Sequence, residues 1–156
     1  MKVVFVCLGN ICRSPAAEAV FRFMLEKEGL SDKISTDSAG IIGVHSGEKA
    51  DRRMIRHAFE RGYIVDSISR KFNPTKDFNE FDMIIGMDDQ NISDLHSLAR
   101  NDSDRKKIHK LSQFLTKHYD KEIPDPYYGG DEGFNHVLDL LEDACKGLLE
   151  KLKREI

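Results

Sequence analysis

The sequence predicts an α/β fold in which a parallel β-sheet is covered by helices. Short apolar or β-branched segments alternate along the chain with longer segments whose apolar residues recur at helical spacing. Such alternation is typical of strand–helix–strand units, whose crossovers are right-handed and whose ligands bind beyond the carboxyl ends of the strands. The 156 residues suffice for one well-packed core, so we expect a single domain over residues 1–156.

Four segments are predicted to be strands because they are short and either β-branched or bounded by glycine. They occupy residues 2–7, 33–38, 81–87 and 107–111. Helical periodicity predicts helices at residues 15–28, at 50–61, directly after Asp88, and at 134–153. Ser14 and Asp88 are of the types that cap helix N-termini, and Gly29 is expected to end the first helix. The polar residues 116–133 are expected to form a loop.

Composition argues against several classes of protein. The net charge of −3, with acidic and basic residues mixed, argues against general affinity for nucleic acid or for membranes. No segment has the length and apolarity of a membrane span, and we expect no secretory signal. Three cysteines do not make a disulfide framework, so a reducing cytoplasm is expected. The histidines lack metal-ligand spacing, and apart from His45 they are expected at the surface or at helix ends.

The most informative segment is CLGNICRSP, at residues 7–15, between the first strand and the first helix. A loop that runs into a helix N-terminus directs backbone N–H groups and the helix dipole at a bound anion. Gly9 lets the backbone approach that anion, and Asn10 tolerates a left-handed conformation. The planar guanidinium of Arg13 suits two phosphate oxygens, and the same positive field favours a thiolate at Cys7. The segment therefore predicts a phosphate site with a cysteine nucleophile and without a metal or other cofactor.

A phosphatase mechanism follows if a proton donor lies near this loop. Cys7 would attack phosphorus and form a cysteinyl-phosphate, which water then hydrolyses. Cys7, Ser38 and Asp88 lie at the ends of predicted strands, so the parallel topology is expected to gather them on one edge of the sheet. Asp125, between two prolines, is a candidate acid for the leaving oxygen. From the residues alone, an ordinary Asp-Pro turn explains Asp125 at least as well.

In order and spacing, the motifs of this chain resemble those of the low-molecular-weight protein tyrosine phosphatases. The matching segments are residues 7–15, DSAG at 37–40, Met-Asp at 87–88 and DPYY at 125–128. The resemblance spans nearly the whole chain. It implies a three-layer, flavodoxin-like (phosphotyrosine phosphatase I-like) fold with a four-stranded parallel sheet in the order 2-1-3-4. It also implies hydrolysis of phosphotyrosine and small aryl phosphates without a cofactor.

The resemblance further implies roles for individual residues. Cys7 is the nucleophile, Arg13 the transition-state clamp, and Asp125 the general acid and base. The phosphate-binding loop comprises Leu8, Gly9, Asn10, Ile11, Cys12 and Ser14. Hydrogen bonds from Asn10, Ser14 and Ser38 are expected to hold the loop and tune the thiolate. The substrate wall is expected to consist of Tyr127, Tyr128, Val44 and His45, with Leu8 and Ile11 as apolar sides.

Two positions depart from the family pattern, and a third position has two open interpretations. Val44 stands where some members have Trp, which predicts a less aromatic rim. Ser67 stands where some have His, and it is expected to replace part of that residue's hydrogen bonding to the loop. Cys12 is either a partner that traps an oxidised Cys7 as a disulfide or a small buried packing residue.

Three other functions are alternatives to tyrosine phosphatase activity. The protein arginine phosphatase branch of the same fold has Thr where this chain has the apolar Ile11. A thiol-coupled arsenate reductase needs further closely spaced cysteines, which the middle of this chain lacks. A phosphopeptide-binding module needs neither the thiol nor the acid. We therefore expect a phosphotyrosine protein or peptide as substrate, phosphate or other oxyanions as loop ligands, and a monomer or weak dimer.

Overall fold

The computed structural model describes residues 1–127 and 130–156 of the chain. Its strands are β1 (Lys2–Cys7), β2 (Ser35–Gly40), β3 (Met83–Gly86) and β4 (Ile108–Lys110). All neighbours pair in parallel, in the order β2-β1-β3-β4. This confirms the predicted sheet and its strand order.

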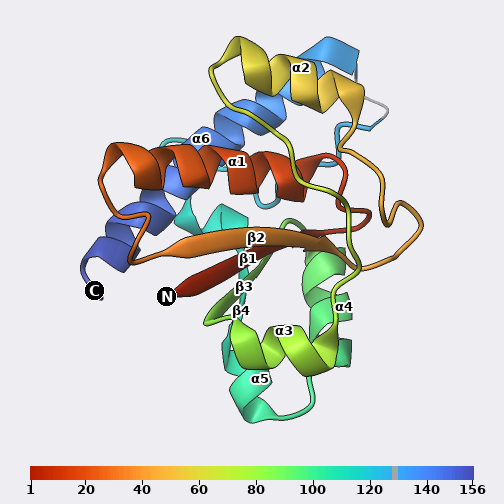
Figure 1. Ribbon diagram of the computed structural model, residues 1–156, viewed down its shortest axis with the longest axis vertical. Helices are drawn as coiled ribbons and strands as arrows, with labels where there is room; N and C mark the ends of the chain where they lie inside the picture. Colours follow the sequence, from red (N-terminus) through yellow and green to blue (C-terminus); the bar gives the residue numbers. More distant parts are fainter. Residues whose placement is uncertain (128–129) are drawn as a thin grey trace.

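Helices cover both faces of the sheet and give the expected three layers. They are α1 (Arg13–Lys27), α2 (Arg52–Glu60), α3 (Pro74–Glu80), α4 (Asp89–Leu98), α5 (Asp102–Lys106) and α6 (Gly130–Lys153), with a 3-10 turn, η1 (Leu111–Phe114). Figure 1 shows α1, α2 and α6 on one side of the sheet and α3, α4 and α5 on the other. Among the described residues, no helix is long and apolar enough to cross a membrane.

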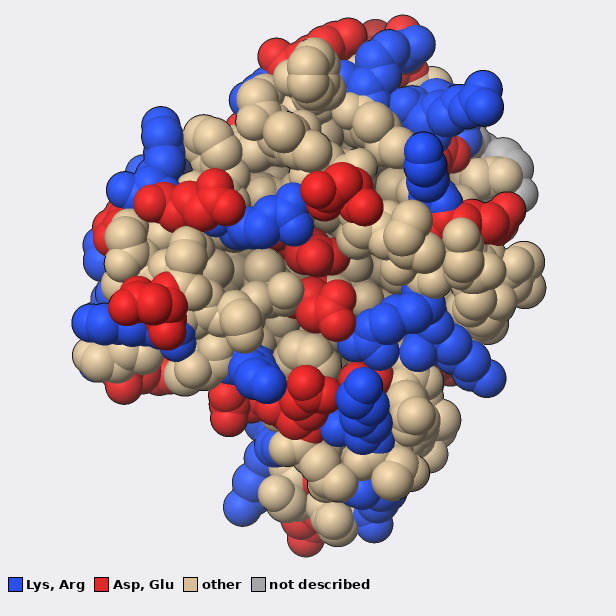
Figure 2. All heavy atoms as spheres, in the orientation of Figure 1, with Lys and Arg blue, Asp and Glu red and all other residues tan. Residues whose placement is uncertain are grey.

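The continuous apolar run of β1 serves two separate cores, because successive side chains point to opposite faces of a sheet. Val3 and Phe5 join the larger core, which α1 and α6 complete. Val4 and Val6 join a smaller core with Phe72, Phe78 and Leu95. On the face seen in Figure 2, acidic and basic side chains are interspersed rather than segregated.

Two short helices were not predicted, and a third begins earlier than expected. α3 and α5 follow Asn73 and Asn101, whose side chains accept the backbone N–H groups of Lys76 and Asp104. These asparagines are ordinary N-caps, so the sequence did carry a signal for both helices. The prediction of a loop over 116–133 was wrong at its end, because α6 already begins at residue 130.

The parallel topology places the ends of three strands on one edge of the sheet. Cys7, the last residue of β1, pairs with Gly40, the last residue of β2. Asp88 follows β3 and is the N-cap of α4, where its carboxylate accepts the backbone N–H of Asn91 at 2.7 Å. The loop over residues 8–12 therefore begins at the edge where ligands of α/β sheets are bound.

Candidate active site

The loop over residues 8–12 is held in a shape that needs special residues. Asn10 has φ +58°, a left-handed conformation that asparagine tolerates better than most residues. Gly40 lies directly behind the loop, and a Cβ there would stand 3.0 Å from the carbonyl carbon of Gly9. The backbone N–H groups of Ile41 and Ile42 donate to the carbonyls of Cys7 and Leu8, which ties the start of the loop to the segment after β2.

The Cys7 sulfur lies beside the hydroxyl of Ser14. Cys7 is 3% exposed, and its Sγ is 3.0 Å from Ser14 Oγ. Asn10 Nδ2 donates to that same oxygen at 2.8 Å, so the single hydroxyl hydrogen is left for another acceptor. The two acceptors near that hydrogen are Cys7 Sγ at 3.0 Å and Ala39 O at 3.4 Å, and the sulfur is the closer of the two. The prediction that Ser14 caps α1 was therefore wrong: Cys12 is the N-cap, and the Ser14 side chain points to the sulfur.

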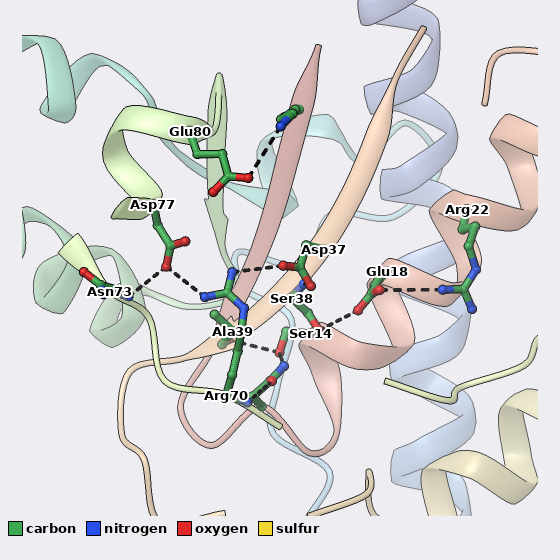
Figure 3. Close-up of polar contacts among 12 residues, drawn as sticks. Ser14, Glu18, Arg22, Asp37, Ser38, Ala39, Arg70, Asn73, Asp77 and Glu80 are labelled. Atoms are coloured by element: carbon green, nitrogen blue, oxygen red, sulfur yellow. Dashed lines mark hydrogen bonds and ion pairs between the residues drawn. The ribbon is translucent and has the colours of Figure 1, made fainter. Parts of the chain in front are cut away.

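A polar network beneath the loop comes from the segment before α3 (Figure 3). The backbone N–H of Arg70 donates to Asn10 Oδ1 at 3.0 Å, and Ser69 Oγ donates to Gly9 O at 3.1 Å. The guanidinium of Arg70 bridges Asp37 and Asp77, at 3.0 Å from each carboxylate. The hydrogen bonds to the loop that were expected from Ser67 thus come from Ser69 and Arg70. No local pattern in the sequence indicated either residue.

Ser38 makes a different hydrogen bond from the one that was expected. Its hydroxyl donates to Glu18 Oε1 at 2.6 Å and not to the loop (Figure 3). Burial raises the pKa of the Glu18 carboxyl, while the Ser38 hydrogen bond opposes that shift. Ser38 consequently joins β2 to α1.

Arg13 is buried and oriented by acceptors from distant parts of the chain. It is 2% exposed, and its Nη1 donates to Asp88 Oδ2 at 2.6 Å and to Ile123 O at 3.0 Å. Its Nη2 lies 3.8 Å from Asp125 Oδ2. Burial disfavours the charged guanidinium, but Cys7 and Asp88 beside it keep the pKa of Arg13 above its ordinary value. Arg13 therefore remains a fixed cation beside the cysteine.

These side chains share one cavity of about 290 Å³. Its lining comprises Cys7, Leu8, Gly9, Ile11, Cys12, Arg13, Ile42, His45, Asp125 and Tyr127. Asn10 and Ser14 lie behind this wall. Ile42 was missed by sequence reasoning, although its place just after β2, in the same loop as His45, was an available signal. Val44 is 74% exposed and does not line the cavity, and Tyr128 lies outside the described residues.

The side chain of Asp125 is the most exposed of the three expected catalytic groups. Its relative exposure is 46%, against 3% for the side chain of Arg13. One carboxylate oxygen accepts the backbone N–H of Tyr127 at 3.0 Å, in a short turn that faces the cavity. The structure therefore brings a carboxyl group to the open side of a cavity whose floor holds the thiol and the guanidinium.

The three cysteines are free and buried. Burial is the main cause that raises the pKa of Cys12 above its usual range, and Asp51 adds to the shift. Cys145 lies fully buried in the larger core, as expected, and burial raises its pKa as well. Both thiols are therefore held in their protonated form, whereas nucleophilic attack requires a thiolate.

Comparisons with a family model and with individual known proteins point to the same family. The model of the low molecular weight phosphotyrosine protein phosphatase family matches residues 2–156. A low molecular weight protein-tyrosine-phosphatase of Streptomyces coelicolor is 39% identical over 157 residues, covering 99% of this chain and 95% of that protein.

Solved structures of similar proteins superpose over almost the whole chain. A protein tyrosine phosphatase from Entamoeba histolytica, with Hepes in its active site, has a TM-score of 0.96 at 47% identity, covering 99% of this chain and 98% of that chain. A Drosophila arginine phosphatase has a TM-score of 0.91 at 32% identity, covering 98% of each chain. The family model matches residues 2–156 and the sheet order is the one that the family resemblance implies, so the chain belongs to the low molecular weight phosphotyrosine protein phosphatase family.

Proposed function

We propose that the protein hydrolyses phosphotyrosine in proteins or peptides, and small aryl phosphates, through a cysteinyl-phosphate intermediate. The observation that carries this proposal is the one cavity lined by Cys7, Arg13 and Asp125. The three residues come from β1, α1 and the segment before α6, so only the fold brings them together. The names of the relatives in the same family support the proposed activity.

In the first step, the phosphate would lie against the N–H groups of the loop and the guanidinium of Arg13. The charge that spreads over the phosphoryl oxygens is stabilised there without rearrangement. Cys7 Sγ attacks phosphorus, and the bond from phosphorus to the tyrosine oxygen breaks. Asp125 gives its proton to that oxygen, so tyrosine leaves as a neutral phenol.

In the second step, water attacks the cysteinyl-phosphate. Asp125, now a carboxylate, takes a proton from the water, and the bond between sulfur and phosphorus breaks. Inorganic phosphate leaves and the thiolate is restored. The Ser14 hydroxyl, 3.0 Å from Sγ, is placed to donate to that thiolate in both steps.

The shape of the cavity favours an aromatic substrate. Leu8, Ile11 and Ile42 supply apolar walls around the thiol, and Tyr127 stands at the mouth. Phosphoarginine is the alternative that the likeness to a Drosophila arginine phosphatase raises. The apolar Ile11 on the cavity wall favours a phenyl ring over a guanidinium.

Three further properties are part of this proposal. We infer that residues 1–156 make up one phosphatase domain, because the family match covers residues 2–156. We infer a reducing cytoplasm as its location, because three free cysteines include the nucleophile. We infer that phosphate and similar oxyanions compete with substrate for the loop, with the protein acting as a monomer or weak dimer.

The direct test is phosphate release from phosphotyrosine, phosphoarginine and phosphoserine peptides of the same sequence, measured in chelator-containing buffer. We expect turnover of the phosphotyrosine peptide by the wild type and none by Cys7→Ser. Cys145→Ala is the matched control, because it removes a buried thiol from the core and should keep activity. Preferential turnover of phosphoarginine would replace the substrate assignment, and turnover by Cys7→Ser would overturn the nucleophile assignment.

A further inference from the structure

Arg53, in the first turn of α2, has a guanidinium that is fixed from one side by Asp51. Its Nε donates to Asp51 Oδ1 at 3.1 Å and its Nη2 to Oδ2 at 2.9 Å, a two-point contact that only a planar fork makes. Asp51 is also the N-cap of α2 and accepts the backbone N–H of Arg53 at 2.8 Å. Burial alone would raise the pKa of Asp51, but the hydrogen bonds from Arg53 lower it below its usual value. The pair is therefore charged at neutral pH.

The anchor of Arg53 is attached to the phosphate-binding loop itself. The backbone N–H of Asp51 donates to Ile11 O at 2.8 Å, and Ile11 lines the cavity beside Cys7. The position of the Arg53 guanidinium is thereby set relative to the loop through one backbone contact and two side-chain contacts.

The guanidinium also lies close to two aromatic rings. Its central carbon is 4.9 Å from the ring centroid of Phe134 and 5.2 Å from that of Tyr127. Phe134 belongs to α6 and is fully buried, whereas Tyr127 is 37% exposed at the cavity mouth. A cation within about 6 Å of a ring centroid attracts the ring. Arg53 thus attaches the exposed ring of Tyr127 to a buried part of the fold.

Tyr127 in turn orients the expected acid. Its backbone N–H donates to Asp125 Oδ1 at 3.0 Å, and the other carboxylate oxygen faces Arg13 at 3.8 Å. The side chain of Asp125 is half-exposed, so these two contacts bear directly on the direction of its carboxyl group. We propose that Arg53 is a positioning residue, which acts through Tyr127 to hold the Asp125 carboxyl at the leaving-group side of the cavity. This inference rests on the proposed function, in which Asp125 gives a proton to the leaving oxygen.

The test compares two substrates that need the acid to different degrees. The phenolate of phenyl phosphate leaves poorly without a proton, whereas p-nitrophenolate leaves readily. The readout is the ratio of kcat/KM for p-nitrophenyl phosphate to kcat/KM for phenyl phosphate. For Arg53→Gln we expect this ratio to rise about tenfold, because a misplaced acid slows only the demanding leaving group. Loss of fold or of phosphate binding would lower both values equally.

Three variants make the test specific. Arg52→Gln changes an exposed neighbour on the same helix and should leave the ratio unchanged. Arg53→Lys keeps the charge without the planar fork, so a partial rise in the ratio is expected. In an Asp125→Asn background, Arg53→Gln should add nothing further to the ratio, because the group that it positions is gone.

The outcomes separate this inference from the function on which it rests. If Asp125→Asn raises the ratio and Arg53→Gln does not, the positioning role is wrong and the acid assignment stands. An effect of Arg53→Gln that persists unchanged in the Asp125→Asn background also overturns the positioning role. If Asp125→Asn itself leaves the ratio unchanged, the proposed acid is wrong. Should Arg53→Gln fail to fold, the ratio in Arg53→Lys decides the question.

Discussion

The guanidinium of Arg13 and the carboxylate of Asp88 are joined by a 2.6 Å hydrogen bond. The two residues begin different helices: Arg13 is the first residue of α1, and Asp88 is the N-cap of α4. Because Arg13 is almost fully buried, its charge depends on such a partner to remain in place. The start of α4 on one face of the sheet thereby orients the cation that is expected to hold the phosphate.

Two substitutions of Asp88 separate its contact with Arg13 from its role as a helix cap. Asp88→Asn retains an oxygen for the cap but loses the charge that faces Arg13. We expect kcat/KM to fall about tenfold or more in both Asp88→Asn and Asp88→Ala, because the guanidinium is no longer held in one direction. Only Asp88→Ala also loses the cap, which should lower the free energy of unfolding by about a further 1 kcal/mol. Steady-state kinetics and urea denaturation of both variants check this, and full activity in Asp88→Asn would contradict it.

Gly40 is expected to be essential for the shape of the phosphate-binding loop. A Cβ at this position would stand 3.0 Å from the carbonyl carbon of Gly9 and 3.1 Å from the backbone nitrogen of Asn10. Gly40→Ala must therefore displace the loop backbone, and we expect kcat/KM to fall about tenfold or more. Gly43→Ala is the control, because the atoms near its Cβ belong to the side chains of Ser46 and Lys71, which can move. Equal activity of the two variants would show that the loop tolerates the displacement.

Two glycines of α6 should respond in opposite directions to alanine. A Cβ at Gly147 would overlap the backbone carbonyl of Phe114 in η1, so Gly147→Ala should lower the free energy of unfolding by about 1–3 kcal/mol. A Cβ at Gly133 would stand 3.8 Å from Pro126 Cβ, an ordinary van der Waals contact. Gly133→Ala should therefore raise the free energy of unfolding by about 0.5–1 kcal/mol, as alanine favours a helix over glycine. Urea denaturation of both variants checks this. Helix propensity alone would predict that both substitutions raise the free energy of unfolding, and that result would contradict the expectation.

Asp143 is expected to make stability depend on acid pH. Its buried carboxylate accepts three backbone N–H groups, from residues 116–118, and the side chains of Thr116 and His118. Burial alone would raise the pKa of Asp143, but these hydrogen bonds outweigh it and hold the pKa below the usual range. A lowered pKa means that the stabilisation is fully present above the pKa of an unfolded Asp, about 3.9, and is lost as pH falls toward the folded value.

The corresponding measurement is the free energy of unfolding of wild type and Asp143→Ala at several pH values. At neutral pH the variant should be less stable by at least about 3 kcal/mol, because buried donors lose their acceptor. This difference should stay constant above about pH 5 and shrink as pH falls below about 3.9, because the unfolded Asp143 then binds a proton that the folded carboxylate resists. Asp139→Ala, at a half-exposed position on the same helix, should show a small difference at every pH. A gap between wild type and Asp143→Ala that does not change with pH would rule out the carboxylate as its source.

Features that depend on a few neighbouring residues could be predicted from the sequence. The apolar run of β1, the left-handed Asn10 and the helix that follows the loop are local, and the structure has each of them, although α1 begins at Arg13 and not after Ser14. The short helices α3 and α5 were missed, although each follows an asparagine cap, because periodicity over so few residues is weak. The family resemblance supplied the sheet order, which propensity does not contain.

Features that arise from tertiary packing could not be predicted in this way. His57 was expected at the surface or at a helix end. It lies in the last turn of α2 but is only 4% exposed, and its ring lies parallel to that of Phe134, at 5.6 Å between centroids. The Arg70 network reaches Asn10 from sixty residues away. Ser14 is of a residue type that often caps helices, but its hydroxyl contacts Cys7 and Asn10. In each case the deciding partner is remote in sequence or belongs to the site, so local propensity was outweighed.

The most direct test of the account is to trap the covalent intermediate. Asp125→Asn, which lacks the expected base for hydrolysis, is mixed with p-nitrophenyl phosphate, whose leaving group departs without a proton from Asp125. The protein is denatured within the first turnover and digested for mass spectrometry. We expect one added phosphoryl group on the peptide that contains Cys7, and no such adduct in Cys7→Ser. Turnover of the substrate with no phosphoryl group on Cys7, or with the group on another residue, would contradict it.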